Sequence, residues 1–183
     1  MLRPPLPRDA GAARRIGLHP DILRMFGEEP EGEWRELTRD ESAELLGALD
    51  PSVDRVTWVV DAGEGFIGSA SLHSFSEDGA RSAYAIGLLD PAVLGQGLGT
   101  EVTRLVLAYA FGALGLVELT VRVLEFNERA IRCYVRCGFI VDHREPDAVF
   151  LFGVNHADVI MRLDSVRYHQ LATEWDEKPG PSS

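Results

Sequence analysis

Residues 83–101 read AYAIGLLDPAVLGQGLGTE, and this stretch decides how the rest of the chain is organised. An apolar run over 83–89 is followed by a turn with a proline, by three glycines at alternate positions, and by a helical pattern that reaches Leu114. Alternate glycines let several backbone N–H groups converge on one ligand, and the following helix adds the positive end of its dipole. The stretch therefore predicts a strand, a glycine loop and a helix. Such a loop is typical of a phosphate site, although glycine loops also serve as structural turns.

The composition is that of one soluble globular domain. The chain has 183 residues, of which 45% are hydrophobic and 26% charged, with a formal net charge of −11. This charge argues against nucleic acid and anionic membranes as partners, because both require a basic surface, and it would attract cationic substrates. An acidic block over 28–44 carries much of the charge. No apolar run approaches the ~20 residues of a membrane span.

The two cysteines, Cys133 and Cys137, are four residues apart on a predicted helix. No further cysteine and no pair of histidines stands at metal-ligand spacing, so we expect no metal. Free cysteines used for packing are typical of a reducing compartment, which favours a cytoplasmic protein.

The order of predicted elements indicates an α/β (α+β) fold. Short helices precede three strands joined by tight turns, which form an antiparallel meander ending at residue 89. The helix after the glycine loop connects this last strand to a strand over 119–123, and a crossover helix makes the two parallel. A helix from Asn127 to about Cys137 and strands over 139–141 and 158–163 complete a domain over residues 1–164. We expect residues 165–183 to be a partly disordered tail.

Two segments together resemble a known family. LDPAVLGQGLGTE (89–101) and VRVLEFNERAIRCYVRCGF (121–139) are similar to motifs of the GNAT superfamily of acyl-coenzyme A-dependent N-acyltransferases, in particular the branch with the ribosomal-protein N-terminal acetyltransferases. The resemblance covers about Leu2 to Leu163. It implies the GNAT fold, a central mixed, mostly antiparallel and splayed sheet of about seven strands flanked by helices. It also implies acetyl-coenzyme A as acyl donor and direct transfer to a primary amine in a ternary complex.

The resemblance also implies a set of cofactor-binding residues. The phosphates of coenzyme A would lie on the glycine loop, where the family usually begins with Arg or Gln and this chain has leucine. The pantetheine arm would pair with the strand before the loop. Asn127 matches an asparagine that commonly contacts the cofactor, and it is equally typical of a helix N-cap. The loop and strand residues concerned are Gly87, Leu88, Leu89, Leu94, Gly95, Gln96, Gly97, Leu98, Gly99 and Thr100.

The expected catalytic residue is Tyr134. It matches a family tyrosine that protonates the leaving thiolate, while core packing is the alternative interpretation of the same side chain. Many relatives carry a glutamate base just before the Ile-Gly pair of the glycine-loop strand, and this chain has Ala85 there. A protein base is therefore either absent or reached through water. The candidates for a water-relayed base are His73, Tyr84, Glu118 and Glu125.

Two other function classes remain open at this point. A dinucleotide-binding βαβ unit would use Glu125 as its ribose-binding acid, although its third glycine would be Thr100. A GNAT-like domain without activity could be an acyl-coenzyme A sensor or interaction module. For the enzyme, the acceptor is a small-molecule or peptide amine, such as a protein N-terminus, a polyamine or an antibiotic. We expect the N-terminal helices and the loops after Phe75 and Glu145 to bind it, and a homodimer is compatible with the sequence.

Overall fold

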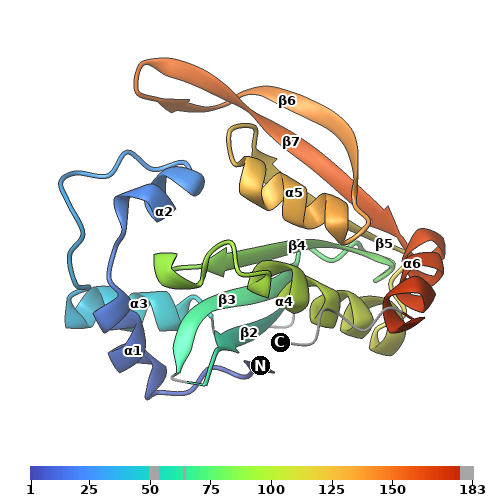
Figure 1. Cartoon of the computed structure of the whole chain (residues 1–183), viewed down its shortest axis with the longest axis horizontal. Coiled ribbons are helices and arrows are strands. Elements are labelled where there is room, and N and C mark those ends of the chain that lie inside the picture. The colour runs from blue at the N-terminus through green and yellow to red at the C-terminus, as the bar shows by residue number, and fades with distance from the viewer. Residues whose placement is uncertain (50–53, 64, 178–183) are drawn as a thin grey trace.

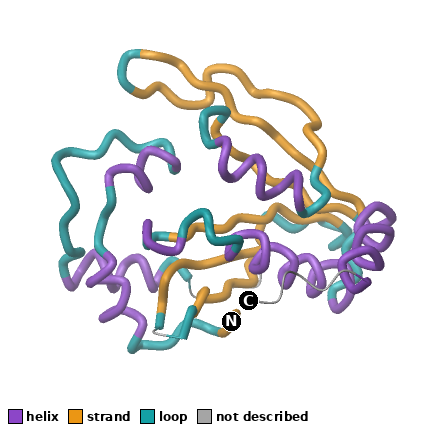
Figure 2. The backbone as a smooth tube through the Cα atoms, viewed as in Figure 1, coloured by secondary structure: helices purple, strands orange, loops and turns teal. Residues whose placement is uncertain are grey.

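The computed structural model describes residues 1–49, 54–63 and 65–177. Their strands form one seven-stranded sheet in the order β1-β2-β3-β4-β5-β7-β6, with helices on both faces (Figures 1 and 2). The strands are β1 (Leu2–Arg3), β2 (Arg55–Asp61), β3 (Phe66–His73), β4 (Arg81–Leu88), β5 (Glu118–Leu124), β6 (Ile140–Leu151) and β7 (Val154–Asp164). The helices are α1 (Asp9–Ile16), α2 (Pro20–Met25), α3 (Arg39–Gly47), the 3₁₀ turn η1 (Pro91–Val93), α4 (Leu98–Leu107), the π-helical turn η2 (Ala108–Ala113), α5 (Glu128–Arg136) and α6 (Ser165–Glu177).

The predicted fold class is confirmed. Strands β1 to β4 pair antiparallel in sequence, β4 and β5 are parallel, and β5, β7 and β6 are again antiparallel. The parallel pair follows from α4, which carries the chain back across the sheet between the two strands. The sheet is therefore mixed and mostly antiparallel.

The sheet splays between β4 and β5. These strands are in register only over Arg81–Ala83 and Glu118–Thr120, although β4 continues to Leu88 and β5 to Leu124. Beyond the third pair, each strand leaves one edge of its backbone without a strand partner. Buried backbone groups need hydrogen-bonding partners, so an edge of this kind is suited to a ligand that binds as an extra strand.

The main hydrophobic core lies between the sheet and helices α4 and α5. Val106 of α4, Leu72 of β3 and Leu119 of β5 are fully buried there. A smaller cluster under α1 and α3 is built around Ala13 and Phe66. The two clusters cover opposite faces of the sheet, and the main cluster contains residues of both splayed strands. In the part of the chain that the structure describes, no helix combines the length and apolar character needed to cross a bilayer.

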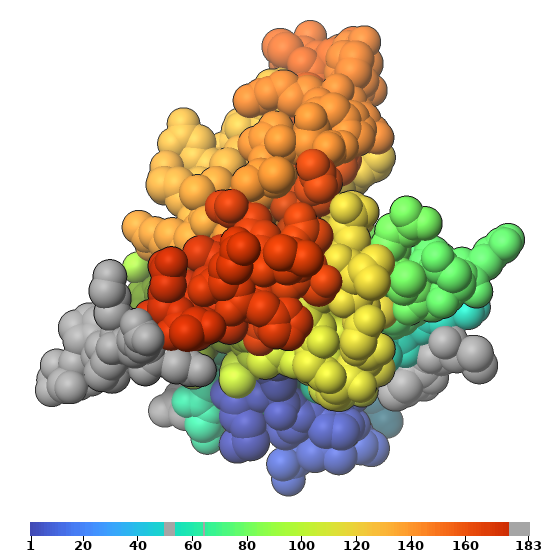
Figure 3. Space-filling model, turned by 90° about the vertical axis from the view of Figure 1, so that its right-hand side faces the viewer, coloured from blue at the N-terminus to red at the C-terminus, as the bar shows by residue number. Residues whose placement is uncertain are grey.

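The C-terminal segment differs from the expected tail. Residues 165–177 form helix α6, which lies at the end of the molecule away from helices α1 to α3 (Figure 1) and faces the viewer in Figure 3. Tyr168 stacks on Phe111 at 4.8 Å between ring centroids, and the guanidinium of Arg104 lies 4.4 Å from the ring centroid of Trp175. These aromatic contacts stabilise the helix. The apolar residues that make them are few and stand among polar residues, so a helical pattern is hard to recognise in the sequence. The rest of the expected tail, 178–183, lies outside the described residues.

The second half of the chain also has longer strands than expected. The short strand predicted over 139–141 and the apolar segment over 149–154 belong to a single hairpin, β6–β7. Its register shifts twice, between Val141 and His143 and between Glu145 and Val149. Such irregularities break the alternation of apolar and polar residues from which a strand is recognised.

Candidate active site

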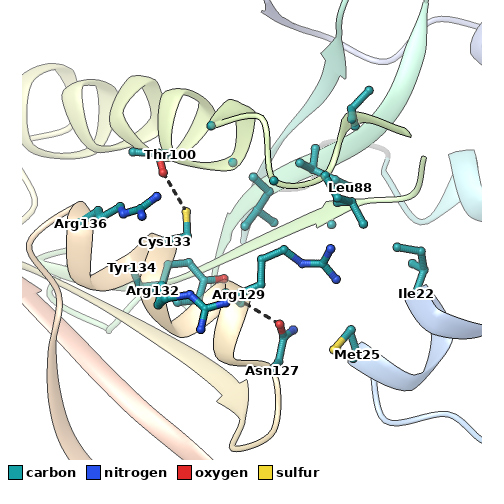
Figure 4. A pocket seen from close by; sticks show the side chains of 18 of the residues that line it. Ile22, Met25, Leu88, Thr100, Asn127, Arg129, Arg132, Cys133, Tyr134 and Arg136 are labelled. Atoms are coloured by element: carbon teal, nitrogen blue, oxygen red, sulfur yellow. Dashed lines mark hydrogen bonds between the residues drawn. The ribbon is translucent and has the colours of Figure 1, made fainter. Parts of the chain in front are cut away.

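A pocket of about 340 Å³ opens where β4 and β5 part. The free end of β4 and the glycine loop form one wall, α5 forms another, and α2 closes the side away from α5 (Figure 4). Most of the residues expected to bind cofactor or to act in catalysis line this pocket: Gly87, Leu88, Leu94, Gly95, Gly97, Gly99, Thr100, Asn127 and Tyr134.

The glycine loop has the geometry of an anion site. Gly95 and Gly97 have φ angles of 78° and 88°, which residues with a side chain rarely adopt. Within the described residues, the backbone N–H groups from 95 to 99 donate to no protein acceptor. They stand at the start of α4, where the helix dipole favours negative charge. Thr100 was also expected to bind the cofactor, but its backbone N–H is not free. It donates to the carbonyl of Gly97 at 2.9 Å within the first turn of the helix.

Three of the expected cofactor residues do not line the pocket. The N–H of Leu89 donates to the carbonyl of Ile67, and the side chain of Leu89 packs on the smaller core cluster. Leu98 packs against the main core. The side-chain amide of Gln96 donates to the carbonyl of Ala92 at 2.6 Å, so it stabilises the loop.

Asn127 begins α5 and faces the pocket. Its Oδ1 accepts a hydrogen bond of 3.2 Å from the backbone N–H of Ala130, which is the predicted N-cap. The same residue lines the pocket (Figure 4). The two sequence interpretations of Asn127 are thus compatible in one geometry.

Tyr134 lies in the middle of α5 with only 5% of its surface exposed. Its ring packs edge-on against Tyr84, at 6.3 Å between centroids, and against Phe139, at 5.7 Å. Its hydroxyl is turned toward the pocket (Figure 4), and no described protein group hydrogen-bonds to it. Burial raises the pKa of this phenol, and the neighbouring thiols Cys133 and Cys137 raise it further. The hydroxyl therefore stays protonated at neutral pH and can donate to a ligand.

Comparison with known protein families gives a match to the acetyltransferase (GNAT) domain over residues 1–140. The chain belongs to the GNAT acetyltransferase family. The match spans the N-terminal helices, the splayed strands, the glycine loop and Tyr134, and GNAT acetyltransferases use acetyl-coenzyme A. The dinucleotide-binding and sensor alternatives are not favoured.

The similar proteins include acetyltransferases that act on polyamines. The chain is 27% identical to the spermidine N(1)-acetyltransferase of Escherichia coli (strain K12) over 152 residues, which cover 83% of this chain and 78% of the relative. Among solved structures, the spermidine N-acetyltransferase of Vibrio cholerae in complex with coenzyme A and spermine superposes with a TM-score of 0.76 at 21% identity, covering 92% of this chain and 97% of that one. A putative phosphinothricin N-acetyltransferase superposes at 0.69 with 18% identity, covering 90% and 98%. The ribosomal-protein branch expected from the motifs is not supported.

The pocket has a basic face that the sequence motifs did not reveal. Arg129, Arg132 and Arg136 line it from α5, and Arg129 extends from α5 toward α2 (Figure 4). Arg132 is paired with Glu128 at 2.8 Å, while the other two have no ion-pair partner among the described residues. The signal was present in the sequence, because arginines at positions i, i+3 and i+7 share one helix face. In a chain of net charge −11, such a face next to an anion loop is informative.

Cys133 also lines the pocket, next to the glycine loop. Its Sγ lies 3.6 Å from the Oγ1 of Thr100 and 4.0 Å from the Oγ1 of Thr103. The Cys137 thiol, these two hydroxyls and the charge of Arg136 lower the pKa of Cys133 to about 6. In the part of the chain that is described, no group of three or more acidic, histidine or cysteine side chains is placed to hold a metal ion.

None of the four candidate bases reaches the pocket. The hydroxyl of Tyr84 is buried and lies 3.1 Å from the Oγ1 of Thr103. Glu118 lies at the paired end of β5, Glu125 accepts from the N–H of Ala157, and the Nδ1 of His73 contacts Ser74. The described lining contains no carboxylate and no imidazole.

Proposed function

We propose that this protein transfers the acetyl group of acetyl-coenzyme A to a primary amine of a polyamine such as spermidine, with both substrates bound at once. The choice of a polyamine as acceptor rests on the similarity to a spermidine N(1)-acetyltransferase along most of both chains. The splayed pocket is consistent with a ternary complex, because the glycine loop and α5 line one part of it and α2 lines another.

The cofactor would be held by backbone and arginine groups. The free N–H groups of residues 95–99 and the start of α4 would bind the diphosphate, and the guanidinium groups of Arg129 and Arg136 would add charge-assisted hydrogen bonds. At Gly87 and Leu88, the edge of β4 that faces away from β3 would align the pantetheine arm as a strand aligns its neighbour. Acetyl-coenzyme A supplies the activated acyl group as a thioester.

Orientation and one proton donor account for the chemistry we assign to the protein. Holding amine and thioester in line in one pocket removes much of the entropic barrier to attack. Tyr134, kept protonated by burial, donates to the departing sulfur. The described lining has no carboxylate and no imidazole, so the proton of the attacking ammonium leaves through water.

The charge distribution supports a cationic acceptor. Glu28, Glu29, Glu31 and Glu33 gather around a second hollow of about 260 Å³ beside α2. Together with the net charge of −11, they raise the local concentration of cations near the side of the pocket that α2 covers. The same negative charges would repel an acceptor with a free carboxylate.

The proposal is tested by thiol release from acetyl-coenzyme A with a panel of amines. The panel contains spermidine, spermine, a peptide with a free N-terminus and an aminoglycoside, and calorimetry compares acetyl-coenzyme A with NAD as ligands. We expect kcat/KM for spermidine to exceed that for the peptide by at least about tenfold, the scale on which a binding difference of about 1.4 kcal/mol acts. Preference for the peptide or the aminoglycoside would overturn the choice of acceptor, and preferential binding of NAD would overturn the use of coenzyme A.

A further inference from the structure

The turn between β6 and β7 carries an aromatic residue where turns of its type favour other residues. Leu151 pairs with Val154, so the loop consists of Phe152 and Gly153, with φ angles of 50° and 78°. Two positive φ angles are typical of the type I′ turn, which favours Asn-Gly, Asp-Gly or Gly-Gly. A bulky side chain at positive φ is uncommon and indicates that another requirement holds it there.

Phe152 reaches across the molecule to α2. Its ring lies 5.6 Å from the guanidinium carbon of Arg24, and its backbone N–H donates to the carboxylate of Glu29 just after the helix. Nearby, Gly27 lies against Val149 of β6, because a Cβ placed on this glycine would be 3.4 Å from the Val149 side chain. The hairpin tip thus contacts the end of α2 although more than a hundred residues separate them in the chain (Figure 1).

The other side of α2 forms a wall of the pocket. Ile22, Met25 and Phe26 line it, and Ile22 and Met25 point inward in Figure 4. A Cβ placed on Gly87 of β4 would lie 3.0 Å from the ring of Phe26, so α2 rests on the free end of β4. A helix of six residues is too short to be stable alone, and its position depends on such contacts.

We infer that Phe152 is a positioning residue: its ring and backbone hold α2 against the pocket and thereby set the site of the amine acceptor. The acceptor part of this inference rests on the proposed function. α5 and the glycine loop, which we assign to the cofactor, lie on the opposite wall. Loss of the Phe152 ring should therefore affect the acceptor and leave the affinity for acetyl-coenzyme A unchanged.

The decisive variant is Phe152→Asn. Asparagine followed by glycine suits this turn better than phenylalanine does and keeps the N–H that Glu29 accepts, so the hairpin itself should be as stable or more stable. Phe152→Tyr retains a ring under Arg24 and should behave as the wild type. Phe150→Ala is the matched control, because Phe150 is on the same hairpin, is 66% exposed against 59% for Phe152, and makes no described contact with α2.

Two readouts are measured on the full chain. Hydrogen exchange followed by mass spectrometry reports the opening of residues 20–27, and steady-state kinetics with spermidine separates KM from kcat. An exposed cation–π contact shifts an equilibrium by about two- to fivefold. We expect Phe152→Asn to speed exchange in 20–27 and raise the KM for spermidine by that factor, with kcat and the Kd for acetyl-coenzyme A unchanged.

The outcomes separate this inference from the proposed function. Exchange in 20–27 that is equally slow in Phe152→Asn and Phe150→Ala overturns the inference. Faster exchange without a change in acceptor KM overturns the positioning of the acceptor. If spermidine is not a substrate of the wild type, the proposed function falls, the exchange result still decides whether Phe152 holds α2, and the kinetics are repeated with the amine that is acetylated.

Discussion

Replacing Tyr134 by phenylalanine should separate catalysis from stability. The change removes one hydroxyl and leaves the ring, which keeps its edge contacts with Tyr84 and Phe139. No described group hydrogen-bonds to this hydroxyl, so no intramolecular hydrogen bond is lost, and the free energy of unfolding should change by less than about 1 kcal/mol. If the hydroxyl protonates the leaving sulfur, kcat should fall by about 10²-fold or more, equivalent to about 2.7 kcal/mol of transition-state stabilisation.

Tyr84→Phe is the control, and it should have the opposite profile. Thr103 donates its hydroxyl proton to the carbonyl of Gly99 at 2.7 Å, so the Tyr84 hydroxyl is the donor in its 3.1 Å bond to Thr103. Removing a buried hydrogen bond of this kind should lower the free energy of unfolding by about 0.5–1.5 kcal/mol. Since Tyr84 does not line the pocket, kcat should stay close to that of the wild type.

Thiol release with the preferred amine measures kcat, and urea unfolding followed by circular dichroism measures stability. A kcat for Tyr134→Phe within about threefold of the wild type is too small an effect for a general acid and would refute the assigned role. An equal loss of kcat in both variants would show that the proton route passes through the pair of tyrosines, contrary to the geometry.

Three further predictions concern other parts of the structure. Gly97→Ala and Gly79→Ala both place a side chain at positive φ with open space around it, so each should lower the free energy of unfolding by about 1–2 kcal/mol. Only Gly97→Ala should weaken the binding of acetyl-coenzyme A in calorimetry. Equal affinities in the two variants would contradict the assignment of the glycine loop to the phosphates. Arg136→Ala should weaken acetyl-coenzyme A binding by about tenfold and less at high salt, and an unchanged Kd would remove this arginine from the site. The guanidinium of Arg3 lowers the pKa of buried Asp9, so this carboxylate stabilises the fold above its unfolded pKa of about 3.9, and the stabilisation is lost as pH falls through the lower folded value. Asp9→Asn should lower the unfolding free energy by about 3 kcal/mol at neutral pH and flatten the acid limb of a stability profile, whereas a parallel acid limb would show that another group is responsible.

The part of the fold that could be predicted depends on local patterns. The glycines from 95 to 99 predicted a loop at the start of a helix, and the crossover helix predicted that β4 and β5 are parallel. The N-cap at Asn127 also follows from residues close in sequence. Each of these features is fixed by backbone conformation within a few residues, so one sequence suffices to find it.

The wall formed by α2 and the order in α6 could not be predicted in this way. α2 lines the pocket through contacts with Gly87 and with the β6–β7 hairpin, and α6 is ordered by Phe111 and Arg104. All of these partners lie far away in the chain. The motifs could not identify the acceptor either, because we assign both the glycine loop and the α5 motif to the cofactor.

The cap at the start of α5 fixes which way hydrogen bonds at Asn127 can run. The carbonyl end of its amide accepts from Ala130, so the NH₂ end is the part turned to other partners. Aspartate would cap the helix equally well but would present an acceptor and a negative charge in the same place. The two residues are interchangeable for the helix. Toward a molecule in the pocket, however, asparagine is a hydrogen-bond donor and aspartate is an acceptor. A carbonyl oxygen on that molecule would thus be matched by asparagine and repelled by aspartate.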